Sequence, residues 1–301
     1  MGFLTFLALA AGPACAGTFT REKIEHGGLT RTYGVYAPSG AVRGLPVIFG
    51  LHGGGVESGQ FRRYTQRSLE RSADRHGFLV VYPDSLAGHW NAGYSKKRRA
   101  AREGVDDVAF LGAVADRLVR ERGAAAKRLY AVGISDGAFM VHRLACEDSL
   151  RWAAVAGLAG ALGAETSAAC RPARPVPILL VNGTEDPFVR WEERHVRLLL
   201  EKIGVRLTVP ETAARWVGLN SCPRKSRHTA LPDRDPKDGT RWDLTAWGPC
   251  KAGSEVLLYR VEGGGHTWPN GKKYSRNLIG RTSHDVDFER LLWSFFARHP
   301  Q

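Results

Sequence analysis

Residues 133–137, Gly-Ile-Ser-Asp-Gly, place a serine where its hydroxyl could act as a nucleophile. The apolar run 129–132 precedes them and a helix-like pattern follows, so we expect Ser135 at a sharp strand-to-helix turn. Glycines suit both flanks because larger side chains would collide with the strained backbone. The alternative is an ordinary turn that uses Gly and Ser only for its geometry.

A serine hydroxyl needs a general base, and the base needs an acid to orient it. Asp186 follows the apolar run 178–181 on a polar turn, and His266 follows another apolar run in a glycine-rich loop. The chain order Ser135, Asp186, His266 is the order that serine hydrolases with this turn use. Glu185 is the alternative acid. Asp186 could instead cap a turn, and His266 could be an ordinary loop histidine.

A run of three glycines follows the apolar residues 46–51. Ester hydrolysis passes through a tetrahedral oxyanion, which needs backbone N–H donors aimed at it. We expect the N–H of Gly53 or Gly54 to form one half of an oxyanion hole and the N–H of Asp136 the other. On its own, such a run would indicate only a turn.

Two tryptophans lie near the predicted catalytic elements in the sequence. Trp90 lies just beyond a predicted strand end, and Trp268 follows the predicted base. Both are candidates for substrate binding, as walls of an acyl or alcohol pocket. Packing in the core is the equal alternative for each.

Short apolar runs alternate with amphipathic stretches, which predicts an α/β fold with parallel strands covered by helices. The polar stretch 223–249 indicates a long surface excursion and not a second domain. No repeat or linker divides the chain, so we expect a single domain over residues 17–301. Strands are predicted at 46–51, 78–82, 128–133, 177–181 and 256–261, and helices at 60–75, 106–122 and 288–296.

Residues 1–16 resemble a secretory signal. The apolar run 3–11 is too short to span a bilayer, and Ala14 and Ala16 fit an A-x-A cleavage site. No Lys or Arg precedes the run, so a mis-assigned start or a buried first strand is the alternative. We expect a secreted protein, periplasmic or extracellular, with no stable membrane insertion.

Four cysteines remain after cleavage: Cys146, Cys170, Cys222 and Cys250. An even number in an exported protein predicts disulfides, and four cysteines allow three pairings. The nearest-neighbour pairing would close two loops of moderate length. No C-x-x-C or Cys/His spacing supports a metal site, and the expected chemistry needs neither a metal nor a cofactor.

The chain carries 43 Lys and Arg against 30 Asp and Glu, a formal net charge of +13. Such a surplus fits nucleic acid, an anionic polymer or envelope surface, or only a cationic exported surface. The basic run 96–99 has no interleaved aromatic residues and no nucleic-acid motif beside it. We therefore expect a solvated loop there and no nucleic-acid partner, and an anionic polymer surface stays a candidate.

Six motifs occur in an order that resembles the secreted polyhydroxybutyrate depolymerase-like and feruloyl esterase-like group of α/β-hydrolases. They are residues 51–55, 105–108, 133–137, 144–147, 182–187 and 264–269. The resemblance covers about residue 30 to the C-terminus. It implies an α/β-hydrolase fold, a mostly parallel central sheet with helices on both faces. It also implies Ser135 as nucleophile, Asp186 as acid, His266 as base, a disulfide at Cys146 and secretion.

The chain departs from the family pattern around the expected pocket. Members often carry Ser-Asn-Gly-Gly where residues 135–138 are Ser-Asp-Gly-Ala. A carboxylate beside the nucleophile would either discourage anionic substrates or point into solvent. Residues 190–191 and 268–271 also differ, so the substrate is less well defined than the reaction class.

We therefore expect a secreted serine esterase that acts on a small or oligomeric ester. Polyhydroxybutyrate-type oligomers and feruloyl or acetyl esters of plant polysaccharide are the two substrate classes. Two alternatives are a serine peptidase on the same fold and a non-catalytic, basic envelope-binding protein that retains a hydrolase scaffold.

Overall fold

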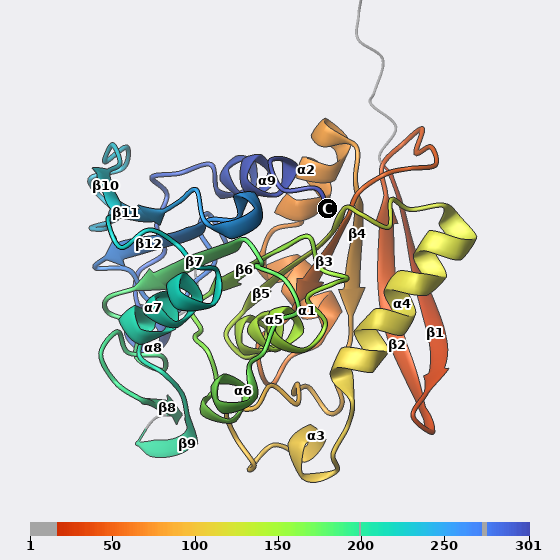
Figure 1. The fold of residues 1–301 in the computed structure, drawn as a ribbon, viewed down its shortest axis with the longest axis horizontal. Helices are drawn as coiled ribbons and strands as arrows, with labels where there is room; N and C mark the ends of the chain where they lie inside the picture. The colour runs from red at the N-terminus through yellow and green to blue at the C-terminus, as the bar shows by residue number, and fades with distance from the viewer. Residues whose placement is uncertain (1–16, 199, 273–275) are drawn as a thin grey trace, which may run out of the picture.

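The structure is a computed structural model that describes residues 17–198, 200–272 and 276–301. The predicted signal segment, residues 1–16, lies outside these ranges. Within them, ten strands form one sheet in the order β1-β2-β4-β3-β5-β6-β7-β12-β11-β10 (Figure 1). Neighbouring strands from β4 to β12 pair in parallel, and antiparallel strands extend the sheet at both edges.

The strands of this sheet are short in the centre and longer at one edge. They are β1 Thr18–His26, β2 Leu29–Ala37, β3 Val47–Leu51, β4 Leu79–Pro83, β5 Leu129–Ile134, β6 Ala154–Leu158, β7 Ile178–Gly183, β10 Arg227–Ala230, β11 Arg241–Trp247 and β12 Val256–Glu262. Every residue of β3 to β7 is buried, as expected for parallel strands covered on both faces. A separate hairpin joins β8 His195–Leu198 to β9 Glu201–Val205.

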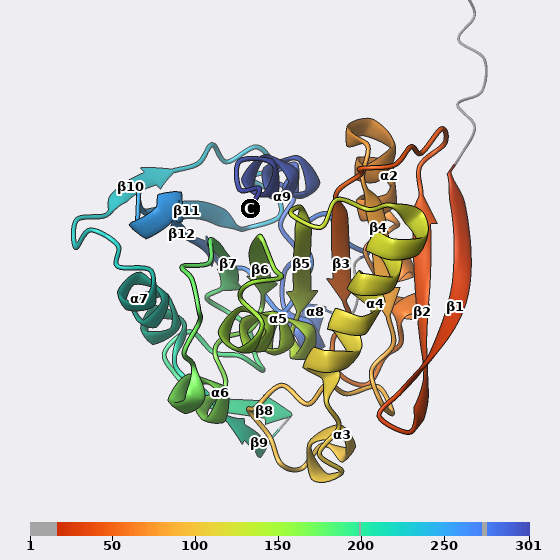
Figure 2. The same cartoon turned by 45° about the vertical axis from the view of Figure 1, so that its right-hand side comes forward.

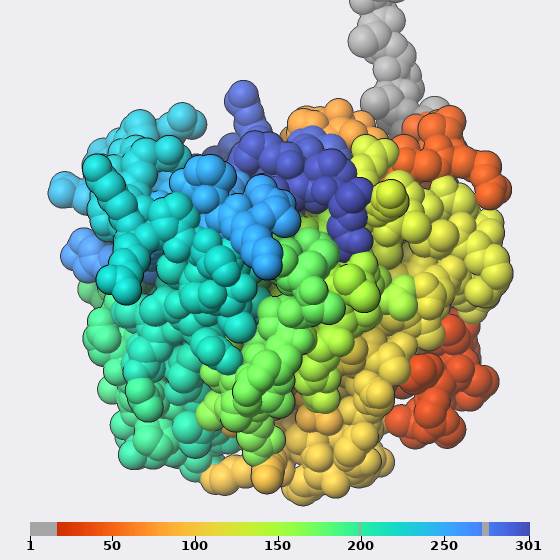
Figure 3. Space-filling view, in the orientation of Figure 1, coloured from red at the N-terminus to blue at the C-terminus, as the bar shows by residue number. Residues whose placement is uncertain are grey.

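Helices cover both faces of the sheet (Figure 2). One core cluster joins the sheet to α4, α5 and α7, and a second joins it to α1, α2 and α9. In the space-filling view, the C-terminal α9 (dark blue) lies beside α2 (orange) (Figure 3). The helices are α1 Ser58–Tyr64, α2 Ser68–His76, α3 Arg99–Arg102, α4 Asp107–Arg122, α5 Asp136–Glu147, α6 Ala164–Ala169, α7 Val209–Leu219, α8 Arg276–Ile279 and α9 Phe288–Ala297. This arrangement confirms the predicted fold class.

Two sequence predictions about elements are wrong. The helix expected at 60–75 is two helices, because Gln66 and Arg67 adopt left-handed φ angles of 54° and 55° between them. The stretch 223–249 is not only a surface excursion, since it contains β10 and β11, which extend the sheet beyond β12. Trp242 and Ala246 lie on the same face of β11 and are buried, and the pairing of β11 with β12 holds the segment in the sheet.

Two disulfides tie the helices that follow the sheet strands to neighbouring loops. Cys146 at the end of α5 pairs with Cys170 after α6, and Cys222 after α7 pairs with Cys250 after β11. This is the nearest-neighbour arrangement of the three possible ones. In the described ranges, the helices lack the length and apolar character needed to cross a membrane.

His142 is a fully buried titratable group on α5, the helix that directly follows the predicted nucleophile. Its Nδ1 accepts a hydrogen bond of 3.1 Å from the indole N–H of Trp216. Burial lowers the pKa of His142 to about 3. The folded protein therefore holds this imidazole neutral, whereas the unfolded chain can protonate it below about pH 6.5.

We expect His142 to make the protein sensitive to acid. Below about pH 6.5 the unfolded state binds a proton that the folded state excludes, so the free energy of unfolding falls as pH falls. The loss is about 1.4 kcal/mol per pH unit down to the folded pKa. His142→Asn keeps an acceptor for Trp216 and does not titrate, so urea unfolding should show a shallower pH dependence. Equal slopes in both proteins would refute this role.

Candidate active site

Three parallel strands bring the predicted catalytic residues to one edge of the sheet. Ser135 follows β5, Asp186 follows β7 and His266 follows β12. These strands lie in the order β5-β6-β7-β12, and their carboxyl ends meet at the same edge. In open α/β sheets this edge is where ligands bind.

The turn around Ser135 has the geometry of a nucleophile elbow. Ser135 has φ 56° and ψ −120°, a strained conformation for a residue other than glycine. A Cβ on Gly133 would lie 2.2 Å from the carbonyl oxygen of Gly137, and a Cβ on Gly137 would lie 2.3 Å from that of Leu51. Both glycines are therefore required by close backbone packing.

Asp186 and His266 form a hydrogen-bonded pair. Asp186 Oδ2 lies 2.7 Å from His266 Nδ1, and Oδ1 accepts the N–H groups of Phe188 and Val189, both at 2.8 Å. The Asp186 side chain is fully buried. With Nδ1 donating to this carboxylate, Nε2 is the nitrogen of His266 that can take a proton from a hydroxyl.

Glu185, the alternative acid, does not contact His266 but pairs with Arg281. The side chain of Glu185 is 58% exposed and forms an ion pair of 2.7 Å with Arg281. The carboxylate that contacts His266 belongs to Asp186.

The glycine loop after β3 lies against the elbow. A Cβ on Gly53 would be 3.3 Å from Ser135 Cβ, and one on Gly54 would be 3.5 Å from Asp136 Oδ2. The loop is fixed by His52, whose ring lies 2.8 Å from the Gly53 carbonyl oxygen and accepts the Ser85 N–H at 3.1 Å. Burial lowers the pKa of His52, which fits a neutral ring in this place.

The two tryptophans do not line an open pocket, which corrects the substrate-binding prediction for both. Trp90 is 1% exposed and donates its indole N–H to the His52 carbonyl oxygen at 3.0 Å. Trp268 is 0% exposed and donates to Glu289 Oε1 at 2.9 Å. Each indole is held in the core, so neither side chain can touch a substrate in this structure.

Two adjacent aspartates at the start of α4 have different roles. Asp106 does cap α4, accepting the Ala109 N–H at 2.9 Å. Asp107 is buried instead, with Arg31 at 2.7 Å and the Asn91 N–H at 2.7 Å. It therefore fixes the loop that carries Trp90, a role that depends on a residue far away in the sequence.

Of the two alternatives for the Asp136 carboxylate, the structure excludes the one in which the side chain points into solvent. It is 2% exposed, and Oδ2 accepts the Trp90 N–H at 3.0 Å.

The basic run 96–99 lies mostly at the surface, as predicted, where three of its four cations have carboxylate partners. They are Lys96 with Glu165, Lys97 with Glu201 and Arg99 with Glu103.

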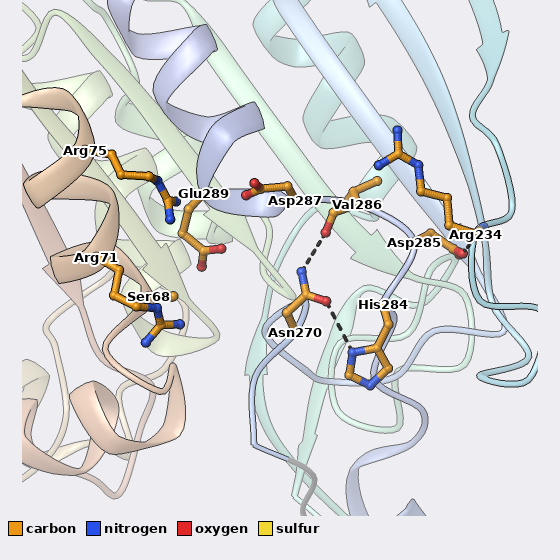
Figure 4. Close-up of a pocket in the computed structure, with 10 residues that line it drawn as sticks. All are labelled: Ser68, Arg71, Arg75, Arg234, Asn270, His284, Asp285, Val286, Asp287 and Glu289. Atoms are coloured by element: carbon orange, nitrogen blue, oxygen red, sulfur yellow. Dashed lines mark hydrogen bonds between the residues drawn. The ribbon is translucent and has the colours of Figure 1, made fainter. Parts of the chain in front are cut away.

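A pocket of about 360 Å³ lies away from this site, between α2 and the start of α9 (Figure 4). Its guanidinium groups face a similar number of carboxylates, and none of Ser135, Asp186 and His266 lines it. Among the described residues, no group of three or more His, Cys, Asp or Glu could hold a metal ion.

Known proteins resemble this chain in sequence and fold. The family model for Esterase PHB depolymerase matches residues 31–180. The chain is 29% identical over 292 residues to "Putative esterase NocK" of Nocardia uniformis subsp. tsuyamanensis, covering 93% of this chain and 83% of that protein. It is 26% identical over 244 residues to feruloyl esterase B of Piromyces equi, covering 78% of this chain and 42% of that protein. The solved structure of an acetyl xylan esterase from Aspergillus awamori has a similar fold. Its TM-score is 0.60 at 14% identity, and the match covers 92% of this chain and 99% of that one.

We expect the reactivity of Ser135 to depend on Asp186 and not on its neighbour. Asp186→Asn should slow labelling of Ser135 by a fluorophosphonate about 10³- to 10⁴-fold, because the amide no longer holds His266 in the required tautomer. Glu185→Gln, the matched control, should stay within about twofold because it breaks only an exposed ion pair. A large loss in Glu185→Gln with little in Asp186→Asn would reverse the assignment.

Proposed function

The chain belongs to the Esterase PHB depolymerase family, and from that premise we propose that Ser135, His266 and Asp186 hydrolyse carboxylic esters through an acyl-enzyme. The family match and the esterase names of the relatives confirm the resemblance seen in the motifs, and the chain is a carboxylic-ester hydrolase. The observation that carries the proposed mechanism is the 2.7 Å contact between His266 Nδ1 and the buried Asp186.

In this mechanism, Ser135 Oγ attacks the ester carbonyl carbon and its proton passes to His266 Nε2. The oxyanion is bound by the N–H of Gly53 or Gly54 and that of Asp136, at the positive end of the α5 dipole. The leaving alcohol takes the proton from His266. Water then attacks the acyl-enzyme, gives its proton to His266, and releases the acid as Ser135 regains a proton. Neither a metal nor a cofactor takes part in these steps.

The alcohol part of the substrate is proposed to be a saccharide. A groove of about 600 Å³ is lined by Thr184, Glu185 and Gly263, which lie next to the catalytic loops in sequence, and by Asp233, Arg241 and Arg281. Charged and polar side chains suit a ligand rich in hydroxyl groups better than an apolar polyester. Feruloyl or acetyl esters of plant polysaccharide are therefore favoured over polyhydroxybutyrate-type oligomers. The net charge of +13 would favour polysaccharides that carry acidic groups.

An ester panel tests this proposal. Wild type and Ser135→Ala are compared on methyl ferulate, acetylated acidic xylan and hydroxybutyrate oligomers, at low and high salt. We expect turnover by the wild type, greatest on the plant-type esters, and loss of at least about 10³-fold in Ser135→Ala. On acidic xylan KM should rise with salt, because screening weakens attraction between the cationic surface and the polymer.

Different outcomes remove different parts of the proposal. Faster turnover of hydroxybutyrate oligomers would overturn the saccharide assignment alone. Turnover that persists in Ser135→Ala would overturn the nucleophile. No turnover of any ester, together with no fluorophosphonate labelling, would favour the non-catalytic scaffold. Amide cleavage that exceeds ester cleavage would favour the peptidase.

Export of a mature single domain over residues 17–301 is also proposed. The A-x-A site at Ala14 and Ala16 and two disulfides support it, since disulfides persist in oxidising compartments. Protein recovered from the periplasm or medium should have the mass of a chain that begins at Gly17 and should show no titratable thiol without reductant. Intracellular retention of the full-length chain, or two or more free thiols, would contradict export.

A further inference from the structure

Asp136 places a buried carboxylate beside the nucleophile. Its side chain is buried, and the residue follows Ser135 directly in the chain. In a site that stabilises a developing oxyanion, a nearby uncompensated negative charge opposes the reaction. A buried carboxylate at this position therefore implies a structural role for Asp136 and a nearby cation that balances its charge.

The carboxylate accepts a hydrogen bond from the loop that follows β4, and this contact explains its burial. Oδ2 accepts the backbone N–H of Trp90 at 3.0 Å, and the Trp90 indole in turn donates to the carbonyl oxygen of His52 at 3.0 Å. A Cβ on Gly54 would lie 2.8 Å from His89 Nδ1. The Asp136 carboxylate, Trp90 and His89 thus support the glycine loop that is proposed to bind the oxyanion.

The counter-charge comes through His89. His89 Nδ1 lies 3.3 Å from Asp136 Oδ2, and His89 Nε2 lies 3.4 Å from Arg98 Nη1. A guanidinium can only donate, so Nε2 accepts from Arg98 and Nδ1 carries the hydrogen that faces Asp136. The imidazole therefore connects the carboxylate to a permanent positive charge.

Tyr94 is a further titratable group beside Asp136 and Arg98. Burial and the charge of Asp136 raise the pKa of Tyr94, whereas Arg98 lowers it. The phenol consequently stays protonated and adds no second negative charge. Arg98 then supplies a permanent positive charge that can balance Asp136 through His89.

We propose that Asp136 is a positioning residue for the oxyanion loop, and that Arg98, acting through His89, compensates its charge. This inference rests on the proposed function, because it concerns the oxyanion formed at Ser135. Arg98 and His89 are positioning residues, since their effect reaches the reacting atoms only through Asp136 and the loop.

A double-mutant cycle tests the proposal. Arg98→Gln should lower kcat about tenfold with little change in KM, because the uncompensated carboxylate destabilises only the transition state. On an Asp136→Asn background, where the amide still accepts the Trp90 N–H but carries no charge, Arg98→Gln should have no further effect. Arg98→Lys should recover most of the lost kcat.

Arg102→Gln is the matched control. Arg102 lies on α3 near Arg98, and its guanidinium bonds the Lys97 carbonyl oxygen. It should keep the wild-type kcat. The melting temperature of each variant is measured alongside, so that loss of fold is separated from loss of rate. The rate of Ser135 labelling by a fluorophosphonate gives the same cycle without knowledge of the natural ester.

Equal losses from Arg98→Gln on both backgrounds would overturn charge compensation and leave only a structural role. No loss on either background, or no recovery in Arg98→Lys, would also overturn it. Each of these results is obtained with an active wild type, so the proposed esterase mechanism would stand. A wild type without turnover or labelling would remove both.

Discussion

Buried aspartates that accept backbone N–H groups hold in place the loops at the sheet edge that carries the candidate active site. Loops at the end of a parallel sheet cannot satisfy their amides in the strand ladder, and a buried N–H left without a partner costs about 1–3 kcal/mol. The same solution recurs along the chain. Asp84 accepts from Ser58, Asp107 from Asn91, Asp136 from Trp90, and Asp186 from Phe188 and Val189.

What distinguishes these aspartates is the partner that balances their charge. Asp107 faces the buried guanidinium of Arg31, a cation that does not titrate in proteins, so its environment is fixed. Asp186 faces His266, an imidazole whose other ring nitrogen can take a proton from a hydroxyl in the proposed reaction. A buried aspartate that accepts backbone N–H groups forms a structural ion pair with arginine, as at Asp107, but a candidate catalytic pair with histidine, as at Asp186. Asp136 combines the two, with an imidazole next to it and a guanidinium beyond.

The central strands and the three candidate catalytic residues could be predicted because their signals are local. Continuous apolar runs at β3, β5, β7 and β12 end directly at polar or glycine-rich residues. β6, Ala-Val-Ala-Gly-Leu, is short and built of small residues, and it gives no comparable signal. The burial of Trp90 and Trp268 in the core could not be predicted from local sequence. The Trp90 indole contacts a residue 38 positions earlier, and that of Trp268 a residue 21 positions later.

The choice between Glu185 and Asp186 shows the same limit at the scale of one residue. Both are carboxylates on one turn, and sequence alone ranks neither by burial. Only the tertiary structure shows that Asp186 contacts His266 and that Glu185 contacts Arg281.

The pairing of β3 with β5 sets the distance between Ser135 and the glycine loop that is proposed to bind the oxyanion. Leu51 is in register with Gly133, so the two strands end at the same level and their loops leave side by side. Gly137 then packs against the Leu51 carbonyl oxygen and Gly53 against Ser135, with no room for a side chain at Gly137. A shift of this register by one residue would move the proposed oxyanion donors by about 3.3 Å along the strand. Donors must lie about 3 Å from the oxyanion, so a slip of that size would abolish their contact. The spacing between Ser135 and the glycine loop that the proposed chemistry needs is therefore set by one pair of parallel strands.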